Sequence, residues 1–309
     1  MQYRRLGRAG IKLSAVSLGA WLTYGGTVEG DQSGACVRAA LDAGINHFDT
    51  ADAYQGGHAD EALRAALDGV PRHSYVLATK VFWPIGPGPN DRGTSRKHLV
   101  ESLEASLRRL GTDYVDILYC HRFDEETDPE ETMFALNDLV QQGKVLYAGV
   151  SEWPAHRIRE ARGIQKRLGL RGLGASQPVY NMLNRGIERE VIPACRDEGI
   201  GLVVFSPLAQ GLLTGKYRSG EPVPTDSRGS RNQGMVRAEN LARVDRLRPI
   251  AEQAGLPLGH LALAWILRLP EITAALVGAT RPEQVRENAA AAEIKLTPDV
   301  LAAIDEALK

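Results

Sequence analysis

The chain has 309 residues, which fits one large α/β domain or two small ones. Its apolar content of 43% and charged content of 24% are ordinary for a globular protein. The net charge of -1 gives no electrostatic reason to expect a nucleic acid or an anionic membrane as a partner. No apolar run approaches the roughly 18 residues of a membrane helix, and the N-terminal stretch MQYRRLGRAG lacks the apolar core of a signal peptide.

The cysteines indicate a reducing environment. Cys36, Cys120 and Cys195 are widely spaced and do not match the ligand spacing of a metal site. Pairing two of them would leave an odd thiol. We therefore expect a cytoplasmic protein with free thiols and no bound metal.

Strand and helix patterns alternate along the chain. Segment 1–13 is predicted to form two short strands joined by the turn at residues 7–10. The strands predicted after this hairpin cover residues 16–19, 45–49, 75–80, 115–121, 146–151, 173–177, 201–205 and 274–277. The predicted helices comprise a helical repeat at 36–43 and segments 58–68, 95–110, 129–142, 154–168, 187–198, 240–254, 282–291 and 298–308.

Eight strand-helix units in series predict a TIM (β/α)8 barrel formed by one domain, residues 1–309. Two features exceed a minimal barrel, a long loop at 206–238 and an additional helix at 258–269. A loop of this length is usually functional or disordered. The main alternative, an open doubly wound sheet, would normally carry a GxGxxG fingerprint after its first strand, and the sequence has none there.

Polar residues stand at the ends of three successive predicted strands. Asp49, Lys80 and His121 end the second, third and fourth strands, and Tyr54 follows on the second loop. The carboxyl ends of barrel strands form the active-site face, so we expect these side chains to meet. An ammonium beside a phenol would lower the pKa of the phenol, and an imidazole can donate to a carbonyl oxygen. The set suits proton transfer to an alkoxide, with the hydride coming from a nicotinamide.

The second half of the chain offers groups that suit such a cofactor. Gln177 and Ser151 end strands and can pair with a carboxamide, and Phe205 offers an apolar face to a flat ring. Segment 206–216, SPLAQGLLTGK, carries hydroxyls, backbone N–H groups and a lysine for phosphates. Segment 278–281, GATR, leads into a helix N-terminus beside a guanidinium. Taken singly, each residue also has a structural interpretation, such as an ion pair between Asp49 and Lys80.

The motifs that carry these residues resemble the aldo-keto reductases. The resemblance runs from YRRLG near the start to VGATRPEQVREN near the end. NHFDTADAYQGGHAD, TKVFW, RGTSRKHLVESLEASLRRLGTDYVDILYCHRFD and SPLAQGLLTGKY are similar to the branch that includes the Shaker-type potassium-channel β subunits and their bacterial relatives. The resemblance implies NADPH-dependent reduction of aldehydes and ketones to alcohols, and it is compatible with a homo-tetramer.

The resemblance also implies roles for individual residues. Tyr54 would be the general acid, Lys80 held by Asp49 would lower the Tyr54 pKa, and His121 would orient the carbonyl. The implied cofactor-binding residues are Ser151, Gln177, Phe205, Ser206, Pro207, Leu208, Gly211, Thr214, Lys216, Arg228, Gly278, Thr280, Arg281, Gln284, Glu287 and Asn288. Among them, Thr280 and Arg281 favour the 2′-phosphate of NADPH. The implied substrate pocket consists of Trp21, Tyr24, Trp83 and Arg122.

One position departs from the family pattern, and two other functions remain open. Glu152 stands where many relatives have Asn or Arg, and an acid there either accepts a hydrogen bond from the carboxamide or turns away. The first alternative function is a nucleotide-binding regulatory partner with slow redox activity. The second is a lyase that forms a Schiff base on Lys80, which a neighbouring Asp49 disfavours by keeping the amine charged.

Overall fold

A closed barrel of parallel strands forms the centre of the molecule. The computed structural model describes residues 1–309 except 22–29, 226, 233 and 235. The strands follow one another around the barrel in the order β10-β3-β4-β5-β6-β7-β8-β9, and each pairs in parallel with its neighbours. The barrel strands are β3 (Val16–Gly19), β4 (His47–Asp49), β5 (Val76–Val81), β6 (Val115–Cys120), β7 (Val145–Ser151), β8 (Ala175–Gln177), β9 (Gly201–Phe205) and β10 (Ile272–Val277).

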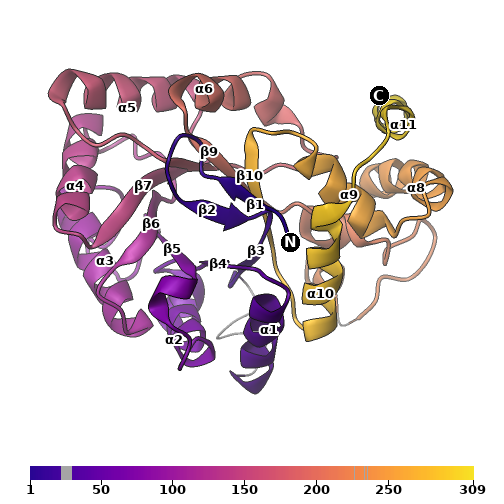
Figure 1. The fold of residues 1–309 in the computed structure, drawn as a ribbon, viewed down its shortest axis with the longest axis horizontal. Coiled ribbons are helices and arrows are strands. Elements are labelled where there is room, and N and C mark those ends of the chain that lie inside the picture. Colours follow the sequence, from indigo (N-terminus) through magenta and orange to yellow (C-terminus); the bar gives the residue numbers. More distant parts are fainter. Residues whose placement is uncertain (22–29, 226, 233, 235) are drawn as a thin grey trace.

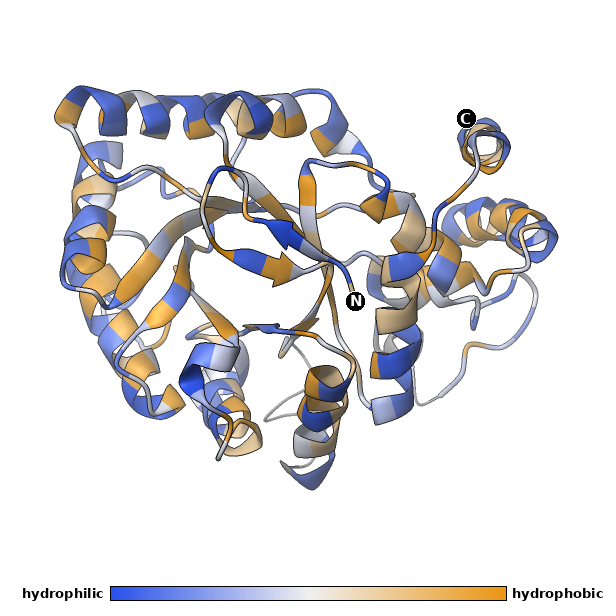
Figure 2. Cartoon of the chain, viewed as in Figure 1, coloured by the Kyte–Doolittle hydropathy of each residue, from blue (hydrophilic) through white to orange (hydrophobic). Residues whose placement is uncertain are grey.

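Helices surround the barrel as an outer ring (Figure 1). The helices are α1 (Gly30–Asp42), α2 (His58–Ala66), α3 (Arg96–Leu110), α4 (Pro129–Gln141), α5 (Ala155–Leu168), α6 (Val191–Glu198), α7 (Arg228–Arg231), α8 (Ala238–Gln253), α9 (Leu258–Leu267), α10 (Pro282–Ala290) and α11 (Pro298–Ala307), of which α8 and α11 lie outside the ring. The ring helices are banded with hydrophobic and hydrophilic residues in Figure 2, as expected for helices that bury one face. The sequence prediction of a (β/α)8 barrel is therefore confirmed.

The N-terminal hairpin closes one end of the barrel. β1 (Tyr3–Arg5) pairs antiparallel with β2 (Lys12–Ser14), and the two strands cross the middle of Figure 1. Leu6 and Leu13 are fully buried and pack with inward side chains of the barrel strands. Gly7 has a positive φ of 55°, and a Cβ there would lie 2.3 Å from the carbonyl oxygen of Gly199. Only glycine allows the hairpin to lie this close to the barrel.

Strand periodicity decides which side chains enter the barrel. Val76 and Ala78 of β5 belong to the interior cluster, and so do Ile117 and Tyr119 of β6. Alternate residues of a strand share one face, so the next inward position on β5 is Lys80, and the position beyond β6 is His121. The same parity that fills the barrel with apolar side chains thus places polar groups at its carboxyl end.

The chain between β9 and β10 differs in detail from the sequence prediction. The segment expected to be a loop contains the 3-10 helix η4 (Ala209–Thr214) and the short helix α7. The sequence predicts segment 258–269 as an addition to the minimal barrel, but α9 packs directly on β10, and nearly all of its residues are buried. α8 packs outside it, against α11. A helix that is apolar all round is stable only when it is buried, which explains why α9 packs on β10 and α8 lies outside it.

Among the described residues, no helix taken alone is long and apolar enough to cross a membrane. α8 and α9 meet that length and composition only as a pair, across a bend of 90°. Cys36, Cys120 and Cys195 are all buried free thiols.

Candidate active site

A buried ion pair lies at the centre of the barrel's carboxyl end. The Lys80 ammonium donates to Asp49 Oδ1 and, at 2.9 Å, to the carbonyl oxygen of Thr50. The two charged side chains are only 1% and 2% exposed. Burial lowers the pKa of Lys80, but the charge of Asp49 and the Tyr54 phenol raise it, and the net direction is upward. Lys80 therefore stays an ammonium, which disfavours the Schiff-base alternative.

Tyr54 and His121 lie beside this ion pair. Lys80 Nζ is 5.0 Å from the centre of the Tyr54 ring. The Tyr54 and His121 rings meet edge to face, with their centres 5.7 Å apart. The structure therefore brings together all four side chains that the sequence predicted to form the proton-transfer set.

The ionisation of Tyr54 differs from the expectation. Burial raises the pKa of Tyr54 above its ordinary value, while the Lys80 ammonium acts in the opposite direction. Lys80 acts to lower this pKa, as the sequence predicts, but the loss of water around the phenol outweighs that effect. Tyr54 is accordingly protonated at neutral pH, which is the form that a general acid needs.

His121 is a neutral imidazole. Burial, together with the charges of Lys80 and Arg122, lowers its pKa to about 2. Its Nδ1 is buried and has no hydrogen-bond partner among the described residues. A buried N–H without an acceptor is costly, which favours the tautomer that carries its proton on Nε2. That nitrogen can then donate to a carbonyl oxygen.

Gln177 connects the ion pair to the opposite side of the barrel. Its Nε2 donates to Asp49 Oδ2 at 2.9 Å, although the two residues are 128 positions apart in sequence. Ser151, on the neighbouring strand β7, donates through Oγ to the backbone oxygen of Gln177 at 2.8 Å. The side-chain oxygen of Gln177 can still accept a hydrogen bond from a carboxamide.

Glu152 turns toward the protein backbone. Its Oε1 accepts a hydrogen bond from the Val179 N–H at 2.6 Å, and its φ is 57°. This left-handed conformation is uncommon for a residue with a side chain. The Val179 N–H is thus the partner of Glu152 Oε1, and a contact between Glu152 and a carboxamide stays a prediction.

The segment after β9 forms a compact loop beside the same opening. Phe205 is half-buried at the end of β9, and Ser206 follows it with a positive φ of 51°. Pro207 and Leu208 lead into η4, where Gly211 accepts a hydrogen bond from Thr214 Oγ1 at 2.8 Å. Lys216 is exposed, with its ammonium 5.2 Å from the centre of the Tyr217 ring. Thr214 and Lys216 are thus available to a ligand.

The last predicted group gathers at the start of α10. Arg281 is the exposed N-cap residue of this helix. Thr280 donates to Gln284 Oε1 from its backbone N–H at 2.9 Å and from Oγ1 at 3.2 Å. The predicted residues of this group are Gly278, Thr280 and Arg281 before the helix and Gln284, Glu287 and Asn288 on one of its faces.

Aromatic side chains border the opening. Trp21 is 37% exposed and Trp83 is 40% exposed, which is high for residues of their size. The Trp83 ring lies 6.1 Å from the His121 ring, and the Arg122 guanidinium lies 5.4 Å from the Trp83 ring centre. Tyr24 lies outside the described residues, and so does the side chain of Arg228.

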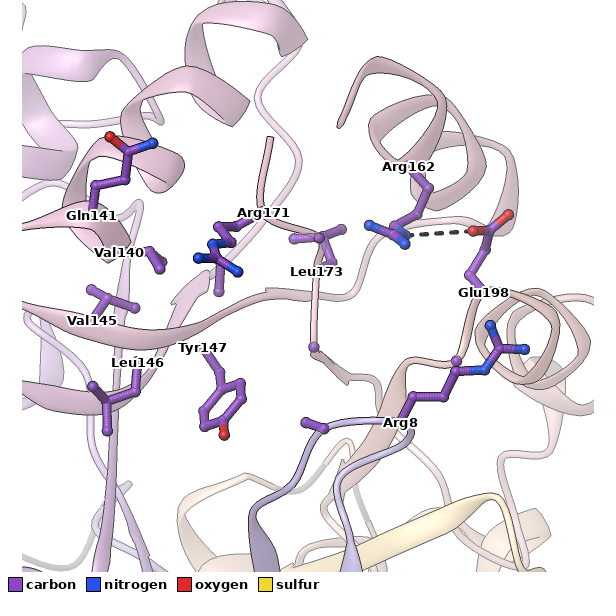
Figure 3. Close-up of a pocket in the computed structure, with 15 residues that line it drawn as sticks. Arg8, Val140, Gln141, Val145, Leu146, Tyr147, Arg162, Arg171, Leu173 and Glu198 are labelled. Carbon is purple, nitrogen blue, oxygen red and sulfur yellow. Dashed lines mark ion pairs between the residues drawn. The ribbon is translucent and has the colours of Figure 1, made fainter. Parts of the chain in front are cut away.

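A cavity of about 850 Å³ lies at the other end of the barrel and is not this site (Figure 3). Its walls come from the hairpin turn, from the start of β7 and from the chain before β8 and β9. Arg162 and Glu198 form an ion pair at its edge, with Arg162 Nε 3.4 Å from Glu198 Oε2. The amino ends of barrel strands seldom carry chemistry, so we assign the reaction to the carboxyl end.

Comparison with known proteins identifies the family. The family model described as "Aldo/keto reductase family" matches residues 15–309. The chain belongs to the aldo/keto reductase family. This assignment confirms the resemblance seen in the sequence and makes an oxidoreductase function the general expectation for this aldo/keto reductase.

The relatives of this aldo/keto reductase carry two kinds of name. A protein of Arabidopsis thaliana named "Probable voltage-gated potassium channel subunit beta" is 43% identical, over 100% of this chain and 97% of its own length. A "Putative voltage-gated potassium channel subunit beta" of Schizosaccharomyces pombe is 42% identical, over 99% of this chain and 93% of its own length. An "L-glyceraldehyde 3-phosphate reductase" of Escherichia coli (strain K12) is 38% identical, over 99% of this chain and 92% of its own length.

Proposed function

We propose that this chain is an NADPH-dependent reductase that converts aldehydes and some ketones to alcohols. The observation that carries the proposal is the buried Lys80–Asp49 ion pair with Tyr54 and His121 in contact around it. A buried charge pair is costly, and it is weak evidence for a purely stabilising role. Its place at the carboxyl end of the strands is where this fold carries chemistry.

In this proposal Tyr54 is the proton donor. Its phenol is kept neutral by burial and delivers a proton to the oxygen of the reduced carbonyl group. The Lys80 ammonium stabilises the phenolate that remains, and Asp49 holds Lys80 in place. His121 donates a hydrogen bond to the same carbonyl oxygen and thus orients it. Trp21 and Trp83 shape the substrate pocket.

The residues at this end of the barrel fit a nicotinamide dinucleotide. A bound NADPH would supply the hydride. Ser151 and Gln177 would hold the carboxamide, and Phe205 would cover the ring. The residues proposed for the pyrophosphate are Ser206, Leu208, Gly211, Thr214 and Lys216. Pro207 is proposed as a further cofactor contact, and Arg228 is proposed to cover the cofactor from the long loop. Those proposed for the adenosine end are Gly278, Thr280, Arg281, Gln284, Glu287 and Asn288.

Aldehyde turnover tests the proposal directly. The protein is titrated with NADPH and then with NADH by tryptophan fluorescence, and aldehydes are then added while the absorbance of the reduced nicotinamide is followed. L-glyceraldehyde 3-phosphate belongs in the panel because of the name of the Escherichia coli relative. Multiple turnovers with NADPH support the proposal. A protein that binds neither cofactor would contradict it.

A regulatory role is the second candidate, favoured by the names of the plant and fission-yeast relatives. In that case the chain would bind NADPH tightly but would oxidise little more than one equivalent of it, whatever the aldehyde. Counting the cofactor molecules oxidised per chain separates the two candidates.

We expect Arg281→Ala to weaken the binding of NADPH far more than that of NADH. A guanidinium beside a helix N-terminus suits the additional phosphate of NADPH. Hydrogen bonds to charged groups contribute about 1.5–3 kcal/mol, so the Kd for NADPH should rise about 10-fold or more. Arg286→Ala is the matched control, because Arg286 is exposed on the same helix and pairs with Glu283. Equal losses for both cofactors in Arg281→Ala would mean that Arg281 does not contact the 2′-phosphate.

A further inference from the structure

A polar face of α3 packs against the segment that carries Tyr54. Ser102, Ser106 and Arg109 are spaced four and three residues apart, so they share one side of this helix. Ser102 and Ser106 are buried, and Arg109 is 24% exposed. Buried positions on the inner face of a ring helix are normally occupied by apolar residues. The three polar residues are part of the motif RKHLVESLEASLRRL, and the proposed chemistry uses none of them.

Arg109 forms an ion pair with a buried carboxylate of α2. Its Nε and Nη2 donate to Asp60 Oδ2 at 3.1 and 2.9 Å, and Nη2 also donates to Ser106 Oγ at 2.9 Å. The other oxygen of Asp60 accepts from Thr50 Oγ1 at 2.8 Å. Asp60 has no exposed surface, so its charge depends on these donors.

Thr50 connects Asp60 to the Lys80–Asp49 ion pair. Its side chain is held by Asp60, and its backbone oxygen accepts from Lys80 Nζ at 2.9 Å. The Lys80 ammonium thus takes one of its two acceptors from a residue that α2 and α3 hold in place. Arg109 and Lys80 are thus connected through Asp60 and Thr50, with the side chain of Thr50 on Asp60 and its backbone oxygen on Lys80.

Ser102 holds the other side of the same segment. Its Oγ donates to Asp52 Oδ2 at 2.5 Å, and Asp52 Oδ1 accepts from the Ala53 N–H at 2.6 Å. Ala53 directly precedes Tyr54. The α3 face therefore contacts Asp52, two residues before the proton donor, and reaches Thr50 through Asp60.

A glycine makes room for the arginine. Gly57 has a φ of 97°, and a Cβ at this position would lie 2.8 Å from Arg109 Nε. The guanidinium of Arg109 thus packs directly against the turn between Tyr54 and α2.

We propose that Ser102, Ser106 and Arg109, acting through Asp60 and Asp52, are positioning residues that set the distance between Lys80 and Tyr54 for proton transfer. This inference rests on the proposed function, because it assumes that Tyr54 donates the proton and Lys80 supports it. The four contacts on Asp60 and Asp52 hold segment 50–54 at Thr50 and at Asp52. A misplacement of about 1 Å can cost about 100-fold in rate.

Arg109→Met tests the proposal, with Arg108→Met as its matched control on the exposed side of α3. We expect kcat per NADPH-binding site to fall about 10- to 100-fold in Arg109→Met, with Kd for NADPH unchanged. The pH above which kcat falls should also move upward, because a displaced Lys80 no longer lowers the pKa of Tyr54. Hydrogen exchange of residues 50–57 should be faster, and that of β7 should be unchanged. Arg109→Lys should recover part of kcat.

The outcomes separate this proposal from the proposed function. Loss of kcat without a change in its pH profile, or a loss equal to that of Arg108→Met, would overturn the positioning role. Should Arg109→Met not fold, Ser102→Ala removes one hydrogen bond and is judged by the same pH profile and exchange rates. A wild-type protein without multiple turnovers would refute the proposed function instead, and the exchange of residues 50–57 would still show whether Arg109 holds the segment.

Discussion

Tyr54→Phe should reduce aldehyde turnover about 10²- to 10⁴-fold while leaving NADPH binding nearly unchanged. The substitution removes one hydroxyl group and keeps the ring that meets His121 edge to face. Asp49 and Lys80 keep their ion pair, because neither depends on the phenol for its principal contact. Only the proton donor is lost, so the effect should fall on kcat.

The measurement is steady-state reduction of an aldehyde that the wild-type protein turns over, together with a fluorescence titration with NADPH. Tyr147→Phe is the matched control, because Tyr147 is a partly exposed tyrosine at the cavity on the other end of the barrel. Tyr147→Phe should turn over as the wild type does. Wild-type turnover by Tyr54→Phe would remove Tyr54 from the reaction.

The fold could be predicted because each unit of the chain carries its own local signals. Ser95 caps α3 by accepting from the His98 N–H, and Gly111 ends that helix in the left-handed conformation. Pro129 stands in the first turn of α4, where its missing N–H costs no helical hydrogen bond. Eight such units leave a closed barrel as the simplest arrangement, and the ends of its strands then follow from parity.

Contacts between distant strands could not be predicted in this way. The hydrogen bond from Gln177 to Asp49 crosses the barrel, and no local pattern relates two residues 128 positions apart. The Arg109–Asp60 pair likewise depends on how α2 and α3 pack. A signal was present, since Ser102, Ser106 and Arg109 place three polar residues on one helix face, but it did not name their partners.

The pKa of Tyr54 also needed the structure. The sequence places an ammonium near a phenol, which argues for a lowered pKa. It does not show how much water the folded chain removes from the phenol, and this burial raises the pKa. Opposing effects of comparable size can be ranked only when the burial of the group is known.

Asp52 makes stability depend on pH near neutrality. Burial raises the pKa of this carboxyl to about 7, although Ser102 and the Ala53 N–H stabilise its charge. The unfolded chain releases the same proton near pH 4. Between these two values the unfolded state is ionised while the folded state still holds its proton. The free energy of unfolding therefore falls as pH rises from about 4 to about 7, and the contribution is constant above that.

Asp52→Asn should abolish this pH-dependent fall in the free energy of unfolding. An asparagine oxygen can accept from the Ala53 N–H, and its amide can donate to Ser102, so both contacts survive without a charge. The free energy of unfolding of the variant minus that of the wild type should increase by about 2–3 kcal/mol from about pH 5 to about pH 8. Urea unfolding at both pH values measures the gain, with the exposed Asp68→Asn as the control. The same difference between variant and wild type at both pH values would show that Asp52 is already ionised in the folded protein at the lower pH.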